Sequence, residues 1–529
     1  MSSMQEEIKR RRTFAIISHP DAGKTTLTEK LLLYGGAINL AGSVKGRKTA
    51  RHAVSDWMDI EKERGISVTS SVMQFEYDGY CINILDTPGH QDFSEDTYRT
   101  LMAADSAVMV IDAAKGVEAQ TIKLFKVCVM RHIPIFTFIN KMDRECGDPF
   151  DLLTEIENVL GIATCPVNWP IGCGKSFRGV YDRNTEKISI FTAANAGMKE
   201  VATEEVTLDT VGDRITFDQK DKLAEDIELL DGASEEFDLE KVRAGELSPV
   251  FFGSALTNFG VETFLKHFID MTTAPLSRES VGDVVVNPES EDFSAFVFKI
   301  QANMNKAHRD RIAFMRIVSG KYEAGMEVSH VQGGRKIRLN QSTQMMAQER
   351  KIVEEAYAGD IIGVFDPGIF AIGDTLYTGK NVQFHGIPTF APEHFARVRQ
   401  IDTMKRKQFV KGINQIALEG AIQIFQEFNS GMEEIIVGVV GVLQFEVLKY
   451  RLESEYNVEI RLEQLPYEYI RWVVNPETVD VAKIQGTSDM KRIRDLKGNP
   501  LLLFVNSWSV GMVLDRNKGL ELAEFGNND

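Results

Sequence analysis

One stretch near the N-terminus decides the fold: Phe14-Ala15-Ile16-Ile17-Ser18-His19-Pro20-Asp21-Ala22-Gly23-Lys24-Thr25. Its apolar residues predict a buried strand, and residues 25–34 predict a helix that begins directly after the loop. A loop between a strand and a helix is the context that phosphate binding requires, because backbone N–H groups and the helix N-terminus can surround the anion. Ser18 stands where the strict pattern has glycine, which weakens the match but keeps a small residue in the turn.

Two side chains of this loop have the chemistry needed to hold a nucleoside triphosphate. Lys24 would reach the β- and γ-phosphates and assist catalysis, and the Thr25 hydroxyl would hold Mg²⁺. We expect nucleotide contacts along the whole segment, namely Ser18, His19, Pro20, Asp21, Ala22, Gly23, Lys24, Thr25 and Thr26.

A second motif, Asp86-Thr87-Pro88-Gly89-His90, follows the apolar run 81–85. A carboxylate at the end of a strand suits Mg²⁺, and the backbone N–H of Gly89 can contact the γ-phosphate of a bound nucleotide. Turns of this composition are common. The position of the motif, directly after a strand of the same domain, favours a nucleotide contact over an ordinary turn.

A third motif, Asn140-Lys141-Met142-Asp143, ends the apolar run 133–139. The Asp143 carboxylate can accept both the N1–H and the exocyclic amine of guanine, whereas adenine presents an acceptor in place of the N1–H. Lys141 can lie over the base, and Asn140 can tie neighbouring loops together. We also expect a backbone contact to the base from the segment that follows the apolar run 250–252, namely Ser254, Ala255 and Leu256.

The segment Ser254-Ala255-Leu256 is the fourth motif. Each motif alone has real false positives, but the four occur in order along the chain and each follows a predicted strand. Their combination indicates a GTPase. A P-loop kinase or ATPase is disfavoured by Asn140 and Asp143, which suit guanine. A guanine-nucleotide sensor with negligible hydrolysis stays open at this point.

The pattern of predicted strands and helices changes along the sequence and predicts three domains, as the length of 529 residues also suggests. Strands alternating with helices over residues 1–280 predict an α/β domain, with an acidic insertion around 195–246. Short strands separated by glycines predict an antiparallel β-barrel over residues 290–385. After a linker at 386–392, residues 395–529 predict an α+β domain, with helices at 411–427 and 441–456 beside a strand at 434–440.

Composition limits the class of protein. The net charge is −17, of which −11 comes from residues 200–246, so the total charge does not decide whether the partner is RNA. A basic run is equally compatible with a solvated helix face and a phosphate contact: Arg397, Arg399, Lys405, Arg406, Lys407 and Lys411. The five cysteines form no CxxC pair, the N-terminus is unlike a secretory signal, and the apolar runs are strand-sized. We expect a cytoplasmic protein without a membrane segment.

With these motifs quoted, the chain resembles the translational GTPases. Arg64-Gly65-Ile66-Ser67 looks like the first switch of that family, where the hydroxyl residue binds Mg²⁺ in the GTP state; the family often has threonine in place of Ser67. His90 matches the histidine that positions the attacking water. Further segments look like the branch that acts in translation termination: residues 95–100, 169–172, 298–304, 308–311 and 441–445.

This resemblance implies hydrolysis of GTP to GDP and phosphate, with Mg²⁺ bound and the 70S ribosome as activator. It also implies that a monomer promotes the dissociation and recycling of stop-codon-reading release factors after peptide release. A translocase or ribosome-protection GTPase is the rival within the family. The chain length and residues 298–304 disfavour it.

Overall fold

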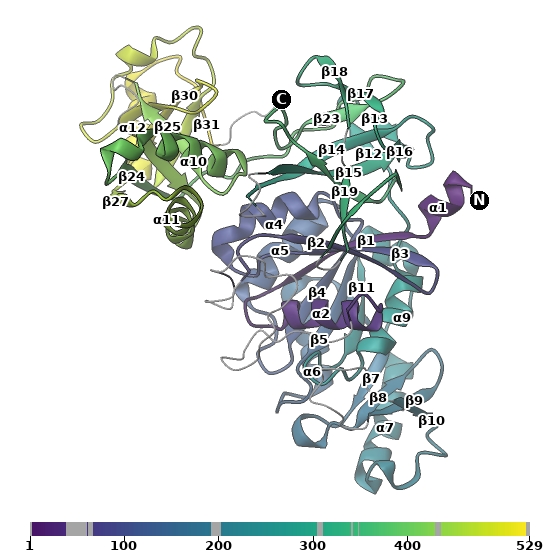
Figure 1. Cartoon of the computed structure of the whole chain (residues 1–529). Helices are drawn as coiled ribbons and strands as arrows, with labels where there is room; N and C mark the ends of the chain where they lie inside the picture. The colour runs from purple at the N-terminus through teal and green to yellow at the C-terminus, as the bar shows by residue number, and fades with distance from the viewer. Residues whose placement is uncertain are drawn as a thin grey trace.

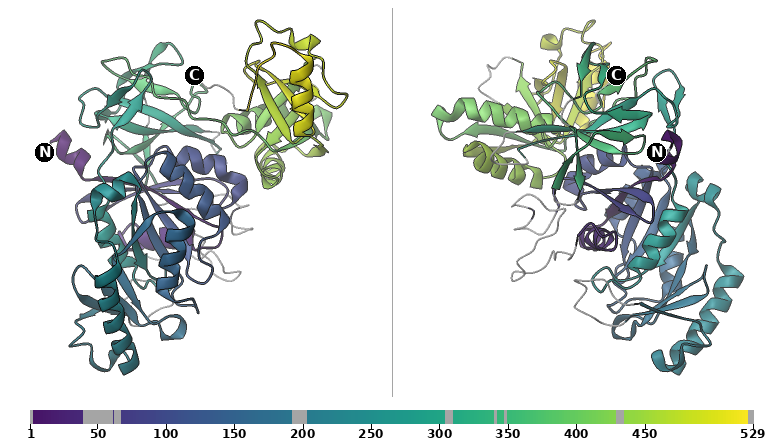
Figure 2. Two further views of the ribbon diagram at one scale, coloured as in Figure 1. Left: turned by 180° about the vertical axis from the view of Figure 1, so that it is seen from behind. Right: turned by 45° about the vertical axis from the view of Figure 1, so that its right-hand side comes forward.

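The computed structural model describes residues 3–38, 61, 67–191, 203–303, 310–339, 342–346, 349–428 and 435–524. Three modules follow one another along the chain, each built on its own large sheet (Figure 1). The first module lies at the centre, and the second and third modules both border its upper side, with the third module to one side in yellow-green. Figure 2 shows the same arrangement from two other directions.

The first module is the expected α/β domain. Its sheet has the described strands in the order β2-β3-β1-β4-β5-β11-β6, all parallel except β2. The strands are β1 (Arg11–Ser18), β2 (Ser71–Tyr77), β3 (Tyr80–Asp86), β4 (Ser106–Asp112), β5 (Ile135–Asn140), β6 (Ala163–Pro166) and β11 (Leu247–Phe252). The loops that carry the four motifs follow β1, β3, β5 and β11, so all four meet at the carboxyl edge of one sheet.

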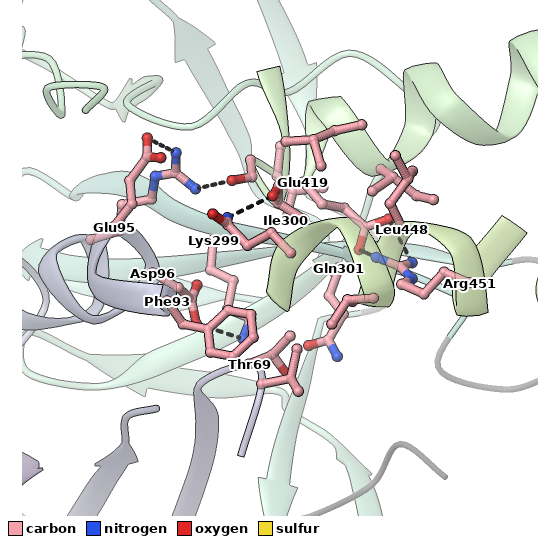
Figure 3. Close-up of a pocket in the computed structure, with 18 residues that line it drawn as sticks. Thr69, Phe93, Glu95, Asp96, Lys299, Ile300, Gln301, Glu419, Leu448 and Arg451 are labelled. Carbon is pink, nitrogen blue, oxygen red and sulfur yellow. Dashed lines mark hydrogen bonds and ion pairs between the residues drawn. The ribbon is translucent and has the colours of Figure 1, made fainter. Parts of the chain in front are cut away.

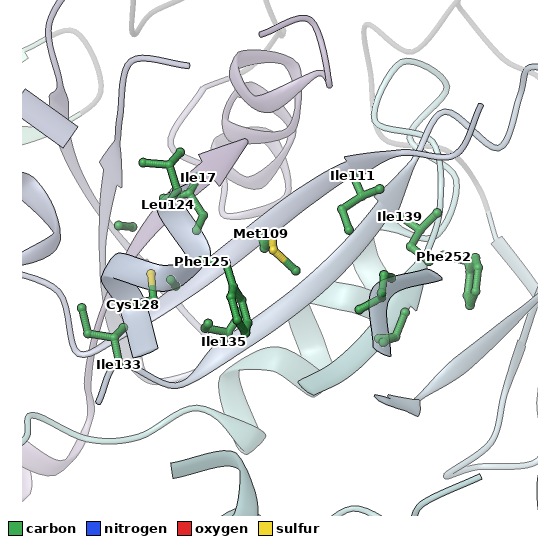
Figure 4. Close-up of a cluster of buried hydrophobic side chains, with 14 of the residues drawn as sticks. Ile17, Met109, Ile111, Leu124, Phe125, Cys128, Ile133, Ile135, Ile139 and Phe252 are labelled. Atoms are coloured by element: carbon green, nitrogen blue, oxygen red, sulfur yellow. The ribbon is translucent and has the colours of Figure 1, made fainter. Parts of the chain in front are cut away.

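Helices cover both faces of this sheet, because successive residues of its strands point to opposite sides. On one face the core is shared with α2 (Lys24–Tyr34) and α9 (Val261–Met271). On the other face it is shared with α4 (Ser94–Leu101), α5 (Ala119–Met130) and α6 (Pro149–Leu160). Figure 4 shows this second core, where side chains of β1, β4 and β5 meet Leu124, Phe125 and Cys128 of α5.

A second, antiparallel sheet extends the first module in the order β10-β9-β8-β7. Its strands are β7 (Asn168–Ile171), β8 (Gly179–Asp182), β9 (Lys187–Phe191) and β10 (Thr203–Val206), followed by α7 (Phe217–Ala233) and α8 (Leu239–Ala244). The substructure thus begins at Asn168, well before the insertion expected at 195–246. Asn168, the first residue of β7, connects this second sheet to the first one, because its side-chain amide forms two hydrogen bonds with the backbone of Phe252 on β11. Trp169 then anchors α7 by donating to Asp226 at 2.9 Å.

The second module is a curled antiparallel sheet, which confirms the expected β-barrel type of domain. Its described strands run in the order β18-β17-β23-β14-β15-β22-β19-β20, with β16 and β21 paired beside them. The strands are β14 (Ser294–Ala302), β15 (Arg311–Ser319), β16 (Lys321–Glu323), β17 (Glu327–His330), β18 (Arg335–Arg338), β19 (Thr343–Met346), β20 (Glu349–Ile352), β21 (Glu355–Tyr357), β22 (Ile361–Phe365) and β23 (Thr375–Tyr377). Its core also receives Ile8 of the N-terminal helix α1 (Met4–Lys9). The hairpin β12 (Arg278–Ser280) and β13 (Val284–Val286) precedes the sheet.

The third module has the expected α+β character. Its described strands run in the order β27-β24-β26-β25-β29-β30-β28-β31. They are β24 (His394–Gln400), β25 (Gln423–Glu427), β26 (Ile435–Val439), β27 (Ile460–Leu465), β28 (Tyr469–Val473), β29 (Lys491–Arg494), β30 (Pro500–Phe504) and β31 (Leu522–Ala523). The helices are α10 (Arg406–Leu418), α11 (Leu443–Tyr456) and α12 (Ser507–Arg516).

One helix of this module was predicted wrongly. Residues 411–427 do not form a single helix, because α10 ends at Leu418 and Gln423–Glu427 is strand β25. Gly420 has φ +76°, a left-handed conformation that stops the helix. Ile424 and Phe425 then point to opposite faces of the sheet and enter different cores. No helix among the described residues is long and apolar enough to cross a membrane.

Candidate functional site

The loop between β1 and α2 has a backbone that needs glycine. Gly23 has φ +100° and precedes Lys24, the first residue of α2. A Cβ on Gly23 would lie 2.3 Å from Nδ2 of Asn140, so even alanine would collide with the neighbouring loop. Asp21 is also left-handed, with φ +66°. The loop therefore wraps tightly at the start of the helix, where backbone N–H groups can face an anion.

Lys24 lies against the second motif. Its Nζ is 2.5 Å from Oδ1 of Asp86, and both side chains are almost fully buried. Thr87 donates its hydroxyl to the carbonyl of Ile16 at 2.7 Å, which fixes the second motif beside β1. A Cβ on Gly89 would be 3.5 Å from Cα of Pro20. The two loops expected to contact phosphate therefore form one continuous surface.

The two hydroxyl groups expected to bind Mg²⁺ come together. The Thr25 and Ser67 oxygens are 3.5 Å apart. The segment after Ser67 is held in place by Asp96 on α4, which accepts hydrogen bonds from the N–H and the hydroxyl of Ser70, both at 2.6 Å. The rest of the expected first switch, Arg64-Gly65-Ile66, lies outside the described residues.

Asn140 joins three loops with one amide group. Its Nδ2 donates to the carbonyl of Ala22 at 2.8 Å. Its Oδ1 accepts from the N–H of Lys141 at 2.8 Å and from the N–H of Ala255 at 2.9 Å. Phosphate loop, third motif and fourth motif are thus assembled around a side chain that is only 1% exposed.

The remaining residues of the third and fourth motifs lie around this centre. Lys141 contacts the carbonyl of Asp21 at 2.5 Å and the carboxylate of Asp112 at 2.6 Å. Asp143 accepts a hydrogen bond from the Ser254 hydroxyl at 2.6 Å. Met142 is fully buried in the core, whereas Leu256 is 55% exposed. Asp112 was missed by sequence reasoning, although it too ends a strand of the sheet.

The two histidines of the site each contact a carboxylate. Nδ1 of His90 lies 3.0 Å from Oδ1 of Asp92, and Nε2 of His19 lies 3.3 Å from Oε1 of Glu118. Neither acidic partner was singled out from the sequence. Asp92 is only two residues from His90 and lies on the short helix η1 (Gln91–Phe93).

These residues fit a nucleoside triphosphate with a divalent cation. Gly23 supplies a cradle that a Cβ would fill, Lys24 supplies a buried cation, and the Thr25 and Ser67 hydroxyls form an oxygen pair of the kind that Mg²⁺ prefers. The structure brings all four sequence motifs to one edge of the sheet.

Three family models match successive parts of the chain. Residues 9–274 match the family model "Elongation factor Tu GTP binding domain", and residues 292–379 match "Elongation factor G domain 2". Residues 384–514 match "Class II release factor RF3, C-terminal domain". The chain is 61% identical to peptide chain release factor 3 of Symbiobacterium thermophilum, with 98% of each chain covered. It is 54% identical to that of Gloeobacter violaceus, with 99% of each chain covered.

The chain belongs to the peptide chain release factor 3 family. As a member of that family it is a translational GTPase of translation termination, which binds guanine nucleotide, hydrolyses GTP and interacts with the ribosome. A crystal structure of a protein from Thermus thermophilus has the same fold, with a TM-score of 0.69 at 22% identity, over 92% of this chain and 72% of that one.

In this member of the release factor 3 family, a cavity beside the GTPase site is lined by all three modules (Figure 3). Lys299 of β14 reaches across it and donates to the carbonyl of Ser70, with Asp96 3.9 Å away. Burial lowers the pKa of Lys299, and the Asp96 carboxylate opposes that shift. From the third module, the carbonyl of Gly420 accepts a hydrogen bond from Arg99 of α4 at 3.1 Å. The segment after Ser67 and the helix after the Asp86–His90 motif are therefore both in contact with the modules that follow them.

Proposed function

We propose that this GTPase promotes the dissociation and recycling of stop-codon-reading release factors from the ribosome after peptide release. One observation carries the proposal. The module that matches the release factor 3 C-terminal domain is bonded directly to the segment that follows His90, through Arg99 and Gly420 and through Asp92 and Leu443. A change at the γ-phosphate can therefore alter the placement of that module, which is the kind of rearrangement that would displace a bound factor.

We assign the following roles to the residues of the site. Lys24 and backbone N–H groups of the phosphate loop hold the β- and γ-phosphates. Asp143 reads the guanine edge, with Lys141 over the base and the 254–256 segment at its carbonyl. Thr25, Ser67 and Asp86 hold Mg²⁺, which would neutralise charge on the phosphates. His90 orients the water that attacks the γ-phosphate, and the products are GDP and phosphate.

We further propose that the 70S ribosome is the activator. Isolated GTPases can hydrolyse GTP at about 10⁻³–10⁻⁴ s⁻¹, and an external element can raise this rate by several powers of ten. In this proposal the protein acts as a cytoplasmic monomer, with domains at residues 1–280, 290–385 and 395–529. The family match and the contacts between the modules support it.

GTP hydrolysis with and without 70S ribosomes tests the proposal, with His90→Ala beside the wild type. His385→Ala is the matched control, because His385 is an exposed histidine of the segment between the second and third modules. We expect strong stimulation by ribosomes in the wild type and the control, and its collapse in His90→Ala. A hydrolysis rate that does not respond to ribosomes would contradict the ribosome-activated role.

Recycling is tested separately by loading ribosomes with a labelled stop-codon-reading release factor after peptide release. The wild type with GTP should accelerate loss of the label, and should leave the position of tRNA on the ribosome unchanged. Movement of tRNA without loss of the label would instead identify a translocase.

A further inference from the structure

The motif Gly441-Val442-Leu443-Gln444-Phe445 lies at the start of α11, and its Leu443 makes one of the two contacts with the first module named above. In the structure this motif faces η1, the short helix directly after His90. The N–H of Leu443 donates to Oδ2 of Asp92 at 2.7 Å. A Cβ on Gly441 would lie 2.2 Å from Cγ of Asp92. Asp92, from another module, therefore occupies the space that a side chain at position 441 would need.

Asp92 supplies a cap that α11 does not have in its own sequence. The cap residue of α11 is Val442, whose side chain cannot accept a hydrogen bond. The carboxylate of Asp92 takes that role at the positive end of the helix dipole. Within the third module, Oε1 of Gln444 accepts from the N–H of Val440 at 2.9 Å and of Gly441 at 3.0 Å. The start of α11 is thus held firmly in its own module and presents the Leu443 N–H to Asp92.

The other oxygen of Asp92 contacts His90. Oδ1 lies 3.0 Å from Nδ1 of the imidazole, and the Asp92 side chain is only 6% exposed. The backbone N–H of Asp92 also donates to Nδ1 of His90, at 3.3 Å, so Nδ1 is the acceptor and the hydrogen of the neutral ring lies on Nε2. Asp92 therefore contacts His90 through its backbone N–H and Oδ1, and it contacts the third module through Oδ2.

Apolar side chains also pack between α11 and the first module. Val68, Phe93 and Val447 form a small buried cluster, with Leu443 packed against it. Phe93 follows Asp92 on η1, Val68 follows Ser67, and Val447 lies one helical turn beyond Leu443 on α11. The contact between α11 and the first module is thus a packed interface as well as a single hydrogen bond.

We propose that Asp92 is a positioning residue that couples the seating of α11 to the orientation of the His90 imidazole. When α11 is seated, the Leu443 N–H holds the side chain of Asp92, and with it the backbone N–H that donates to Nδ1 of His90. When α11 is displaced, Asp92 loses that restraint and His90 loses its fixed orientation. The inference rests on the proposed role of His90 in hydrolysis.

The test disturbs this junction from the α11 side with Gly441→Ala in the full-length chain. Gly441 does not have a left-handed backbone, so alanine is compatible with its conformation, but the new Cβ must push Asp92 and α11 apart. Gly511→Ala is the matched control. Gly511 lies on α12 of the same module, and a Cβ there would meet nothing within 4 Å.

Asp92→Asn is the second variant and changes the chemistry without changing the shape. An asparagine that accepts from the Leu443 N–H with its oxygen places an uncharged NH2 group where the second carboxylate oxygen stands beside the imidazole. The negative charge 3.0 Å from Nδ1 of His90 is then lost. We therefore expect the two variants to disturb His90 in the same way, although one lies in the first module and the other in the third.

Two readouts are needed. The first is the ring nitrogen NMR spectrum of protein with ¹⁵N-labelled histidine, in which His90→Gln identifies the His90 signals. The second is single-turnover GTP hydrolysis on 70S ribosomes beside GTP affinity. We expect Gly441→Ala and Asp92→Asn to shift the His90 ring signals and to slow hydrolysis about tenfold, as for loss of an orienting partner. GTP affinity and the melting temperature should stay near those of Gly511→Ala.

Unchanged His90 signals in Gly441→Ala would overturn the inference, and so would a hydrolysis rate equal to or above the wild type. Failure of the proposed function would appear differently. In that case His90→Ala would keep its ribosome-stimulated hydrolysis, whatever the ring signals of Gly441→Ala show.

Discussion

Asn140 shows how a single residue can assemble a site from distant parts of the sequence. Its amide bonds the phosphate loop and the loop after β11, which are more than 200 residues apart in the chain. A buried amide with its oxygen and nitrogen both bonded is favourable, whereas losing either partner leaves a buried polar group unsatisfied. The motifs of this protein are therefore coupled to one another, and a change in one loop should be felt in the others.

Asp143→Asn tests the assignment of the base-reading residue. Loss of a carboxylate that accepts two hydrogen bonds from guanine should weaken GTP binding by about 10–100-fold, since hydrogen bonds to charged groups contribute about 1.5–3 kcal/mol. Xanthine carries a carbonyl where guanine has the exocyclic amine, so the variant should gain affinity for xanthosine triphosphate. Competition binding with GTP, xanthosine triphosphate and ATP measures both effects. Equal GTP affinity in variant and wild type would remove Asp143 from the base-reading role.

At the scale of elements, His267 connects α9, which covers one face of the seven-stranded sheet, to the antiparallel sheet β10-β9-β8-β7. Its Nε2 lies 2.6 Å from Oδ2 of Asp182, the last residue of β8. Burial alone would raise the pKa of Asp182, but the hydrogen bond with His267 and those from the backbone N–H groups of Asn184 and Thr185 lower it below its usual 3.8. This carboxylate is therefore most stabilising when it is ionised.

The stability contributed by Asp182 should depend on pH in a defined direction. Because the folded pKa is lowered, the contribution is present above about pH 4 and is lost as pH falls through the folded value. Asp182→Asn should cost about 1–3 kcal/mol at pH 7, and the difference from wild type should shrink at acid pH. Thermal unfolding at a series of pH values measures it. A difference that stays constant down to pH 3 would contradict this account.

At the scale of the whole molecule, buried ion pairs hold the second module on the first. Arg316 of β15 contacts Asp105 at 2.6 Å, and Arg11 of β1 contacts Asp360 at 2.7 Å. All four side chains are at most 6% exposed. Breaking such a pair by removing one member is costly, because it leaves a buried charge without a partner. These contacts define where the second module sits relative to the GTPase site.

Arg316→Met should destabilise the protein by about 3–5 kcal/mol near neutral pH. Burial already raises the pKa of Asp105, with Arg316 opposing the shift, so the variant should lose more stability at high pH, where an unpaired carboxylate would be charged. Adding Asp105→Asn should recover part of the loss. Thermal unfolding of the single and double variants at pH 6 and pH 8 measures this. Arg335→Met, at an exposed position of β18, is the control and should behave as wild type.

Local sequence determined much of the fold. Strands β1, β3, β4, β5 and β11 could be predicted because continuous apolar runs are typical of strands buried on both faces. The four motifs were found for the same reason, since each follows such a strand. Local patterns failed where tertiary packing decides, as at residues 411–427, where Gly420 ends α10 and cores on both faces of the sheet make the next residues a strand.

By itself, the sequence determined the nucleotide chemistry of this protein, because the residues proposed to bind phosphate, metal and base lie in short contiguous motifs. Only the tertiary structure decided how those motifs are connected to the rest of the molecule. The contact of Asp92 with His90 is local, but its contact with Leu443 spans 351 residues. A pairing of that kind leaves no periodic or spacing signal in the chain. It exists because two modules pack together and a buried carboxylate needs a partner for each of its oxygens.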